Sequence, residues 1–492
     1  MSLLSAWYSS YQDSNPEKFN TEFIYNRTNE EDIKRILESI ASAMETISNI
    51  KFTGCTIETD ESKFRDLHKI EESRLIQATL SFHLSCEVLG STEVEEKDVS
   101  ITLLLPRIID NFFFKLNGNR YFAIYQLLDT GTYNINNGVG LKTMLMPFVV
   151  SKSPVEIVDV EDNSFRGNLM ELDVFRRKVN VLLYFISECG IDETLNFFGF
   201  SEYFRINDSK ESIDDNDTVF EIRKKVLFLH VSKDFLEKDT WFTHTFVTLL
   251  TKSKVSSLEE IYERSFWNFT LGKIYTQSRD QAEKKSAKIH KSIRRILDQC
   301  TIDTLVHVDP KDKKSIYHIF RWILYNFEDL YKEDNMDLKN KRLRLNEYIL
   351  YPFTKKLSKE TYRCLNSKKL TMKILESVFS NIKPNICITQ LITSELLRYS
   401  GSVNTLDLFS SALKVTQSGP QGVASSDNLQ VRYRGLHPSY LGAVGLHQAS
   451  AGDPGVSLTL TPFVKLDGLY FDKTVKYKTP DSLPDEINLF EE

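Results

Sequence analysis

The organisation of this chain is decided by residues 395–460, which read ELLRYSGSVNTLDLFSSALKVTQSGPQGVASSDNLQVRYRGLHPSYLGAVGLHQASAGDPGVSLTL. Eight of the chain's 19 glycines fall in this stretch. Because glycine permits backbone conformations that side chains forbid, and because helical periodicity is weak here, we expect connected loops and short strands. Four basic residues are spaced through it: Arg398, Lys414, Arg432 and Arg434. A glycine-rich basic surface suits a nucleic-acid backbone, whereas composition alone favours an ordinary surface loop with solvated charges.

The whole chain has the composition of a soluble globular protein. Its 492 residues suffice for two to four domains, and 41% of them are hydrophobic and 26% charged. The longest apolar runs are about six residues and the N-terminal segment lacks a secretory pattern, so we expect neither a membrane span nor an export signal. Six single cysteines without a Cys-x-x-Cys pair indicate a reducing compartment and no zinc ribbon.

The distribution of charge separates the C-terminal region from the rest. A net charge of −6 argues against a free-standing nucleic-acid binder. Between Thr371 and Lys478, however, ten Lys and Arg residues face seven Asp and Glu residues. A local basic groove shared with partner subunits is therefore compatible with the acidic chain.

Local patterns predict an α+β fold. Apolar residues at helical spacing predict a helix over Asn29–Ile50, and strict alternation predicts a half-buried strand over Ile76–Val88. Asn117-Gly118 between the strand-like runs Phe112–Leu116 and Arg120–Leu127 predicts a hairpin, because both turn residues accept a positive φ. Further helices are expected over Val174–Cys189, Ser257–Leu271, Asp280–Gln299 and Lys313–Tyr331. The third of these is strongly basic and presents either a solvated face or a contact with DNA.

Several motifs resemble the β subunit of multi-subunit, DNA-directed RNA polymerases. VRYRGLHPSYLG and the following AVGLHQASAGDPGVSL resemble the fork region, with matches at Arg434, His437, Pro438, Gly442 and Gly452. SGPQGV at 418–423 resembles the fork loop. RYSGSVNTLDLFSSALKVTQSG at 398–419 resembles the segment that lines the path of nascent RNA, with matches at Asn404, Leu406 and Gly419. The hairpin matches at Asn117, Gly118 and Gln126, and EDNMDLKNKRLR at 333–344 matches at Asp337, Leu338, Asn340, Arg342 and Arg344.

The resemblance implies a multidomain β-like architecture. It implies a protrusion-like α/β region over 1–149, a mostly helical lobe-like region over 150–330, a fork-like region over 331–478 that lines the RNA and DNA path, and an acidic tail over 479–492. Cellular β subunits continue well beyond this point, so the chain resembles the N-terminal half of a split β subunit of the giant-bacteriophage type. The implied partners are a β C-terminal half, two β′ halves, a promoter-specificity subunit, template DNA and nascent RNA. The implied location is the cytoplasm of the host bacterium, with packaging in the virion left open.

The chemistry implied by the resemblance is nucleotidyl transfer by the complex, not by this chain alone. The mechanism needs carboxylates that hold two Mg²⁺ ions. In the family these belong to an Asp-x-Asp-x-Asp run of β′, and this sequence has no such run. We therefore expect a partner to bind Mg²⁺. The candidate nucleic-acid contacts of this chain are Arg398, Lys414 and Thr416 on the RNA path, Arg432 and Arg434 in the fork, and the basic cluster Lys341, Arg342 and Arg344. Each could instead form structural ion pairs within the fold.

Two other functions remain open at this stage. The chain could be a β-derived nucleic-acid-binding or assembly protein without polymerase activity. A hydrolase built on His437 and His447 is disfavoured, since the two histidines lack the one-turn spacing of a helical metal site. The alignment also predicts resistance to rifampicin, because the family's drug-binding Asp, His, Arg and Ser are replaced by Gly401, Ser411, Lys414 and Thr416.

Overall fold

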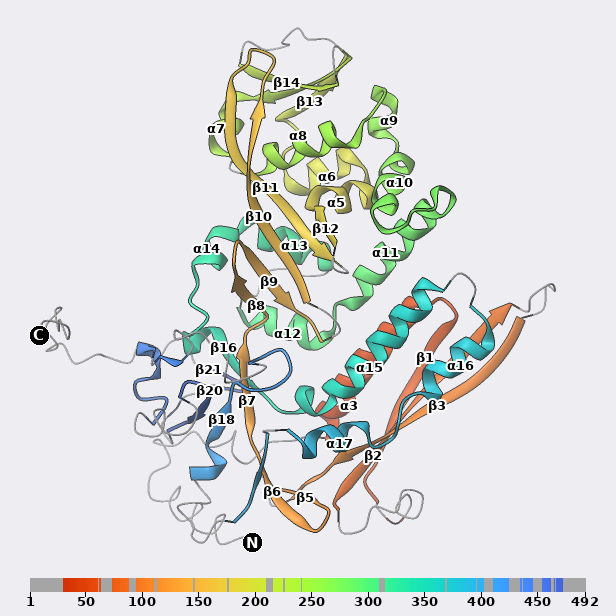
Figure 1. Cartoon of the computed structure of the whole chain (residues 1–492), viewed down its shortest axis with the longest axis vertical. Helices are drawn as coiled ribbons and strands as arrows, with labels where there is room; N and C mark the ends of the chain where they lie inside the picture. Colours follow the sequence, from red (N-terminus) through yellow and green to blue (C-terminus); the bar gives the residue numbers. More distant parts are fainter. Residues whose placement is uncertain are drawn as a thin grey trace, which may run out of the picture. The chain divides into compact units, whose positions relative to one another are not determined.

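The computed structural model divides the chain into two compact units. Unit 1 combines Met1–Thr130 with Asp334–Glu492, and unit 2 is Gly131–Glu333. The structure describes residues 30–60, 62, 73–87, 94–109, 113–144, 147–174, 177–208, 216–223, 226–239, 241–308, 315–367, 370–394, 396–401, 410–423, 434–435, 437–445, 454–461, 464 and 466–471. The mixture of helices and several sheets confirms the α+β class (Figure 1).

The N-terminal part of unit 1 is an antiparallel three-stranded sheet covered by helices. Its strands are β1 (Ile50–Glu58), β2 (Leu75–Glu87) and β3 (Val94–Pro106), and the helices are α3 (Glu30–Ser42), η1 (Ala43–Thr46), α15 (Asn346–Asn366), α16 (Met372–Ser380) and α17 (Ile386–Ile392). The alternation predicted for β2 is confirmed, since its apolar side chains from Ile76 to Cys86 are buried. The predicted first helix ends earlier than Ile50, because that residue begins β1 and pairs with Leu84.

The predicted hairpin forms at Asn117-Gly118. The two residues have φ values of 50° and 79° and connect β5 (Phe113–Leu116) with β6 (Asn119–Ala123). These strands belong to a four-stranded sheet of order β17-β6-β5-β4, which is completed by β4 (Ile108–Ile109) and β17 (Leu397–Tyr399). The second predicted strand does not continue to Leu127, because the chain leaves this sheet at Ile124 and enters another as β7 (Tyr125–Asp129).

A six-stranded sheet of order β19-β18-β7-β16-β21-β20 joins the earlier and later parts of unit 1. Its other strands are β16 (Lys341–Arg344), β18 (Lys414–Thr416), β19 (Ser457–Thr459), β20 (Leu466–Asp467) and β21 (Tyr470–Phe471). Strand β7 pairs antiparallel with β16 and parallel with β18. Two short helices, η4 (Leu338–Asn340) and η5 (Pro438–Tyr440), accompany this sheet. Three parts of the chain that are far apart in sequence therefore meet at β7.

Unit 2 contains two sheets and a group of helices around one core. The sheets are β12-β11-β10-β9-β8 and β13-β15-β14. Their strands are β8 (Thr132–Ile135), β9 (Gly138–Lys142), β10 (Pro147–Val158), β11 (Ser164–Val174), β12 (Arg177–Asn180), β13 (Phe204–Asn207), β14 (Asp217–Arg223) and β15 (Leu227–Ser232). The helices are α5 (Val181–Cys189), α6 (Ile191–Phe198), α7 (Lys233–Lys238), α8 (Phe242–Ser253), α9 (Leu258–Tyr262), α10 (Arg264–Tyr275), η3 (Arg279–Gln281), α11 (Ala282–Ile296), α12 (Gln299–Val308), α13 (Ile316–Tyr325) and α14 (Phe327–Lys332).

The expected helices of this region appear with other bounds, since Ser257–Leu271 is divided between α9 and α10 and Lys313–Tyr331 between α13 and α14. The helix expected from Val174 begins only at Val181, because Val174 ends β11 and the residues after it enter β12, which pairs with β11. Asn180 caps α5 through its side chain, which accepts a hydrogen bond from the backbone N–H of Leu182 at 3.0 Å. Strands also occupy much of residues 147–232, so the helices of unit 2 pack against sheets.

Candidate nucleic-acid interface

Gln126 lies at the centre of the six-stranded sheet and is fully buried. On β7 it is opposite Thr416 of β18 on one side and Arg344 of β16 on the other. Its amide nitrogen donates to the carbonyl oxygens of Ser418 at 3.0 Å and Pro420 at 3.2 Å. Its amide oxygen accepts a hydrogen bond of 2.6 Å from Arg344 Nε. One side chain thus connects the hairpin segment, the EDNMDLKNKRLR motif and the SGPQGV motif.

Arg344 is a buried side chain that bonds both Gln126 and the 418–423 loop. The side chain is 2% exposed, and its guanidinium donates to Gln421 Oε1 at 2.9 Å and to the carbonyl oxygen of Pro420. The guanidinium carbon is also 6.0 Å from the centre of the Tyr348 ring. Burial lowers the pKa of Arg344 to about 10, although the nearby Glu347 opposes that shift. The guanidinium therefore remains charged at neutral pH and holds the 418–423 loop by ionic hydrogen bonds.

The 418–423 loop has two positions that require glycine, one for its backbone conformation and both for lack of space. Gly419 has a φ of 114°, and an added Cβ would lie 2.4 Å from the Tyr348 ring. At Gly422 a Cβ would lie 2.3 Å from the carbonyl oxygen of Gln417 and 2.8 Å from Gln126 Nε2. The backbone N–H of Gly419 donates to the carbonyl of Val423, and that of Val423 donates to the carbonyl of Gln417, both at 2.9 Å. The loop is therefore a closely packed turn.

The other two basic residues of β16 are also buried and paired. Lys341 Nζ lies 2.6 Å from Asp129 Oδ1, and Arg342 makes two bonds of 2.6 Å to the carboxylate of Glu347. Burial alone would raise the pKa of Glu347, but the Arg342 guanidinium outweighs burial and keeps that pKa below its ordinary value. Lys341, Arg342 and Arg344 thus form structural pairs within the fold, the alternative that the sequence left open for them.

The HPSY motif docks on the turn that precedes β16. The ring nitrogen Nδ1 of His437 accepts a hydrogen bond from the backbone N–H of Ser439 at 3.2 Å, and His437 Nε2 lies 3.5 Å from Asp334 Oδ2. Ser439 Oγ in turn accepts a hydrogen bond of 3.0 Å from the backbone N–H of Leu338 in η4. His437 therefore has a structural role as the cap of η5.

An exposed basic and aromatic edge lies on the four-stranded sheet. Arg398 and Tyr399 are both exposed on β17, the last strand of that sheet, and Tyr399 is 64% exposed. The rings of Tyr399 and Tyr121 meet edge to face at a centroid distance of 6.2 Å. Strand register places Arg398 opposite Phe122 and Lys115 opposite Arg120, so these three cationic side chains share one face. The same register places the exposed Tyr399 and the half-buried Tyr121 on the opposite face of this edge. An edge strand that presents an aromatic ring on one face and cations on the other suits single-stranded nucleic acid, which offers bases for stacking and phosphates for pairing.

The remaining candidates differ in accessibility. Thr416 is buried, and its hydroxyl accepts a hydrogen bond of 3.1 Å from the backbone N–H of Ser418. Lys414 is half-buried on β18 and Arg434 is exposed. Arg432 and His447 lie outside the described residues. Within the described part of the chain, no group of three or more His, Cys, Asp or Glu side chains could hold a metal ion.

The sequence did not single out Lys115, Arg120, Tyr121 and Tyr399 as site residues. Their grouping depends on the pairing of β17 with β6, whose residues are separated by more than 270 positions. The only local signal was the Asn117-Gly118 hairpin, which predicts β5 and β6 but not their third strand.

Comparison with known families identifies the class of protein. Residues 9–472 match the family model described as non-virion RNA polymerase subunit. The chain belongs to this family. No curated protein matches the sequence. The chain is accordingly a subunit of a bacteriophage RNA polymerase, and other polymerase subunits are its partners. The family's name refers to enzymes that act in the infected cell and not in the virion.

Among the described helices, none combines the length and apolar character needed to cross a membrane.

Proposed function

We propose that this chain is the N-terminal half of a split β-like subunit and that it shapes the fork and the RNA path of the polymerase. The observation that carries the proposal is the meeting of three motifs at Gln126. Each motif resembles a β-subunit segment, and they lie at 117–126, 333–344 and 418–423. Arg344 and the 418–423 loop both hydrogen-bond to Gln126. A resemblance spread along a chain gains weight when its parts become neighbours in the fold.

Within this proposal the nucleic-acid contact falls on the exposed residues. Arg398 and Tyr399 of β17 contact nascent RNA, with Lys115 and Arg120 adding positive charge on the Arg398 face. Lys414 and Arg434 remain candidate contacts of the RNA path and the fork. Lys341, Arg342, Arg344 and Thr416 act indirectly, since they are buried and hold the sheet and the 418–423 loop. The Mg²⁺ ions of nucleotidyl transfer are bound by a β′-like partner, and this chain alone is inactive.

The first test is a pull-down of the tagged chain from infected cells, followed by mass spectrometry and a transcription assay on the eluate. The proposal requires a separate β C-terminal half and β′ fragments in the eluate, with template-dependent nucleotide incorporation that the chain alone lacks. A promoter-specificity subunit is expected with them. Recovery of the polymerase activity without β- or β′-like chains would refute the split-β assignment. Recovery of nucleic acid alone would favour the alternative, a β-derived binding protein.

A second test concerns the RNA contact itself. In the purified polymerase, RNA carrying 4-thiouridine near its 3′ end is crosslinked to the wild type and to the variant Arg398→Gln/Tyr399→Ala. Loss of one charge-assisted contact and one stacking contact reduces the yield of crosslinks to this chain at least tenfold. Lys383→Gln, an equal change of charge at an exposed residue of the same unit, serves as the control. Equal crosslinking by both variants would exclude β17 from the RNA path.

A further inference from the structure

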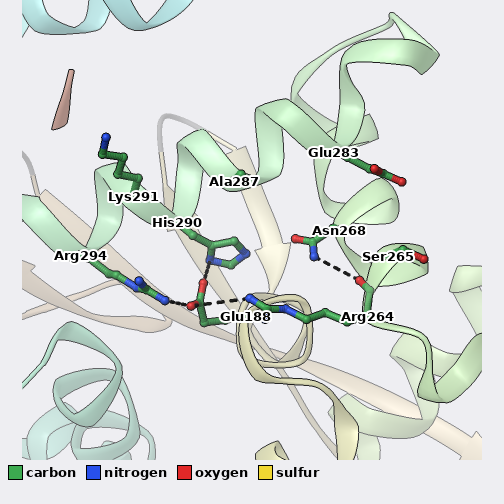
Figure 2. Close-up of a pocket in the computed structure, with 9 residues that line it drawn as sticks. All are labelled: Glu188, Arg264, Ser265, Asn268, Glu283, Ala287, His290, Lys291 and Arg294. Carbon is green, nitrogen blue, oxygen red and sulfur yellow. Dashed lines mark hydrogen bonds and ion pairs between the residues drawn. The ribbon is translucent and has the colours of Figure 1, made fainter. Parts of the chain in front are cut away.

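A pocket of about 750 Å³ lies in unit 2, where α5, α10 and α11 meet. It is lined by Glu188, Arg264, Ser265, Asn268, Glu283, Ala287, His290, Lys291 and Arg294 (Figure 2). The volume falls in the range of pockets that bind small molecules, which is roughly 300–1,000 Å³. The pocket is independent of the interface described above, because all of its residues belong to unit 2.

A buried carboxylate positions two arginines in this pocket. Glu188, whose side chain is 7% exposed, pairs with Arg294 and has Arg264 Nη2 at 3.9 Å from its Oε1. Figure 2 shows the two guanidinium groups reaching Glu188 from opposite sides. Arg264 Nε also donates to the carbonyl oxygen of Ser187 at 3.2 Å, which fixes that side chain a second time. The two cations therefore have defined places before any ligand arrives.

Both arginines keep donors for a ligand. A guanidinium carries five N–H groups, and the contacts just described use only part of them. The Arg264 and Arg294 side chains are 56% and 57% exposed, although the carboxylate that they share is buried. Their remaining N–H groups thus face the open side of the pocket. Planar, two-pronged donors of this kind match the oxygens of phosphate groups.

The charge of the surroundings favours an anion. Lys291 adds a third cation to the lining, and the exposed Lys284 and Lys288 lie on the same helix, α11. His290 contributes no charge near neutral pH, because burial and the Arg264 cation lower its pKa to about 4. Its Nδ1 lies 3.1 Å from Glu188 Oε2 and 2.6 Å from the Tyr317 hydroxyl. Of the two carboxylates in the lining, Glu188 is paired and buried and Glu283 is exposed, so the accessible wall has three cationic side chains against one acidic side chain.

From this geometry we propose that the α5–α10–α11 pocket binds the polyphosphate group of a nucleotide, with Arg264 and Arg294 contacting the phosphate oxygens. A concave pocket of this size admits a terminal phosphate chain, and two arginines with a neighbouring lysine offer contacts to more than one phosphate. Ser265 supplies a neutral hydroxyl at the wall. Nothing in the proposal depends on the part that unit 1 has in RNA synthesis.

The test is isothermal titration of the full chain with inorganic pyrophosphate, and then with ATP, GTP and a single-stranded oligonucleotide that lacks terminal phosphates. Pyrophosphate binds with a dissociation constant below 1 mM, and the nucleoside triphosphates bind at the same site and compete with it. Arg264→Gln and Arg294→Gln each weaken binding about tenfold or more, as expected when one charge-assisted contact is lost. Lys284→Gln, on the same helix but outside the lining, changes affinity less than threefold.

A matched variant separates loss of the ligand contact from loss of structure. Arg294→Gln leaves Glu188 buried with one fewer cation, so the double variant Glu188→Gln/Arg294→Gln restores the net charge of the wild-type site and should remain folded while binding equally weakly. No binding of pyrophosphate at 10 mM to the wild type overturns the proposal. Equal losses in Lys284→Gln and Arg294→Gln overturn it as well, since they indicate diffuse attraction to α11. Tighter binding of the oligonucleotide than of either triphosphate, sensitive to the same arginines, overturns the assignment to a nucleotide.

Discussion

Replacing Arg344 by methionine tests whether the 418–423 loop depends on the buried guanidinium. The change removes three charge-assisted bonds, to Gln126 Oε1, Gln421 Oε1 and the Pro420 carbonyl. Pro420 retains the amide of Gln126 as a donor, and the half-buried Gln421 can bond to water. Gln126 Oε1 loses its donor in a fully buried site.

These losses define the expected size of the effect. An unpaired buried acceptor costs roughly 1–3 kcal/mol, and each lost bond to a charged donor adds a smaller net amount once solvation of the cation is counted. We therefore expect the free energy of opening the loop to fall by about 3 kcal/mol, a factor of about 100 in the opening equilibrium. Arg344→Lys keeps the charge but not the fork of donors, so its effect is intermediate.

Hydrogen exchange measured by mass spectrometry reads this opening directly. The N–H groups of Gly419, Gly422 and Val423 are all bonded within the loop, and they should exchange about 100 times faster in the variant. Arg107→Gln is the control, because Arg107 is a largely exposed arginine that lies 3.9 Å from Glu30. Its replacement should leave the loop unchanged. If exchange over 413–423 is the same in Arg344→Met as in the wild type, the guanidinium does not hold the loop.

Three further predictions follow from particular residues. Gly419→Ala should destabilise unit 1 by about 2 kcal/mol in urea unfolding, because φ is 114° and the Cβ would meet Tyr348, whereas Gly54→Ala, with nothing within 4 Å, should not. Between pH 6.5 and 4 the unfolded state binds a proton at His290 that the folded state does not, so stability falls as the pH is lowered through this window. The variant His290→Asn lacks this titrating group, so its free energy of unfolding should fall by about 3 kcal/mol less than that of the wild type over the same pH range. Urea unfolding of both proteins at each pH measures the difference. Transcription by the purified polymerase should persist at rifampicin concentrations that stop a sensitive bacterial enzyme, and inhibition at those concentrations would reject the alignment at Lys414 and Thr416.

Local structure in this chain follows from local sequence. The alternation of β2 and the positive φ values at Asn117 and Gly118 are properties of a few consecutive residues, and both predictions are confirmed. The helix expected from Val174 was wrong in its first turns because a neighbouring strand, β11, pairs with residues 177–180. No property of those residues alone indicates that pairing. Tertiary contacts thus overrode the helical pattern where a sheet edge was available.

At the candidate site, too, local sequence could not predict the tertiary pairing that decides which side chains are buried. Lys341, Arg342 and Arg344 form a basic cluster in sequence, and an exposed cluster would suit phosphate. Their burial follows from the position of β16 between β7 and β21, and the partners Asp129 and Gln126 lie more than 200 residues away. Conversely, Tyr399 becomes notable only because it remains exposed beside Tyr121 in the assembled sheet. Charge and residue type singled out these segments in the sequence, whereas strand pairing decides which of their side chains are accessible.

The burial of Arg344 itself argues for a positioned loop. A buried cation that bonds mainly to neutral oxygens is costly, and an apolar side chain of similar volume would commonly be as stable or more stable at such a site. An apolar side chain, however, could not bond Pro420 and Gln421 at the same time as Gln126. What Arg344 adds is a defined geometry, since its planar fork fixes the loop carbonyl and two side chains relative to β7. Gly419 and Gly422 add to this, because the loop packs against Tyr348 and Gln126 without space for a Cβ. Contacts with Arg344, Gln126 and Tyr348 therefore restrict the 418–423 loop to one conformation. A loop needs a fixed conformation if it is to separate or guide nucleic-acid strands.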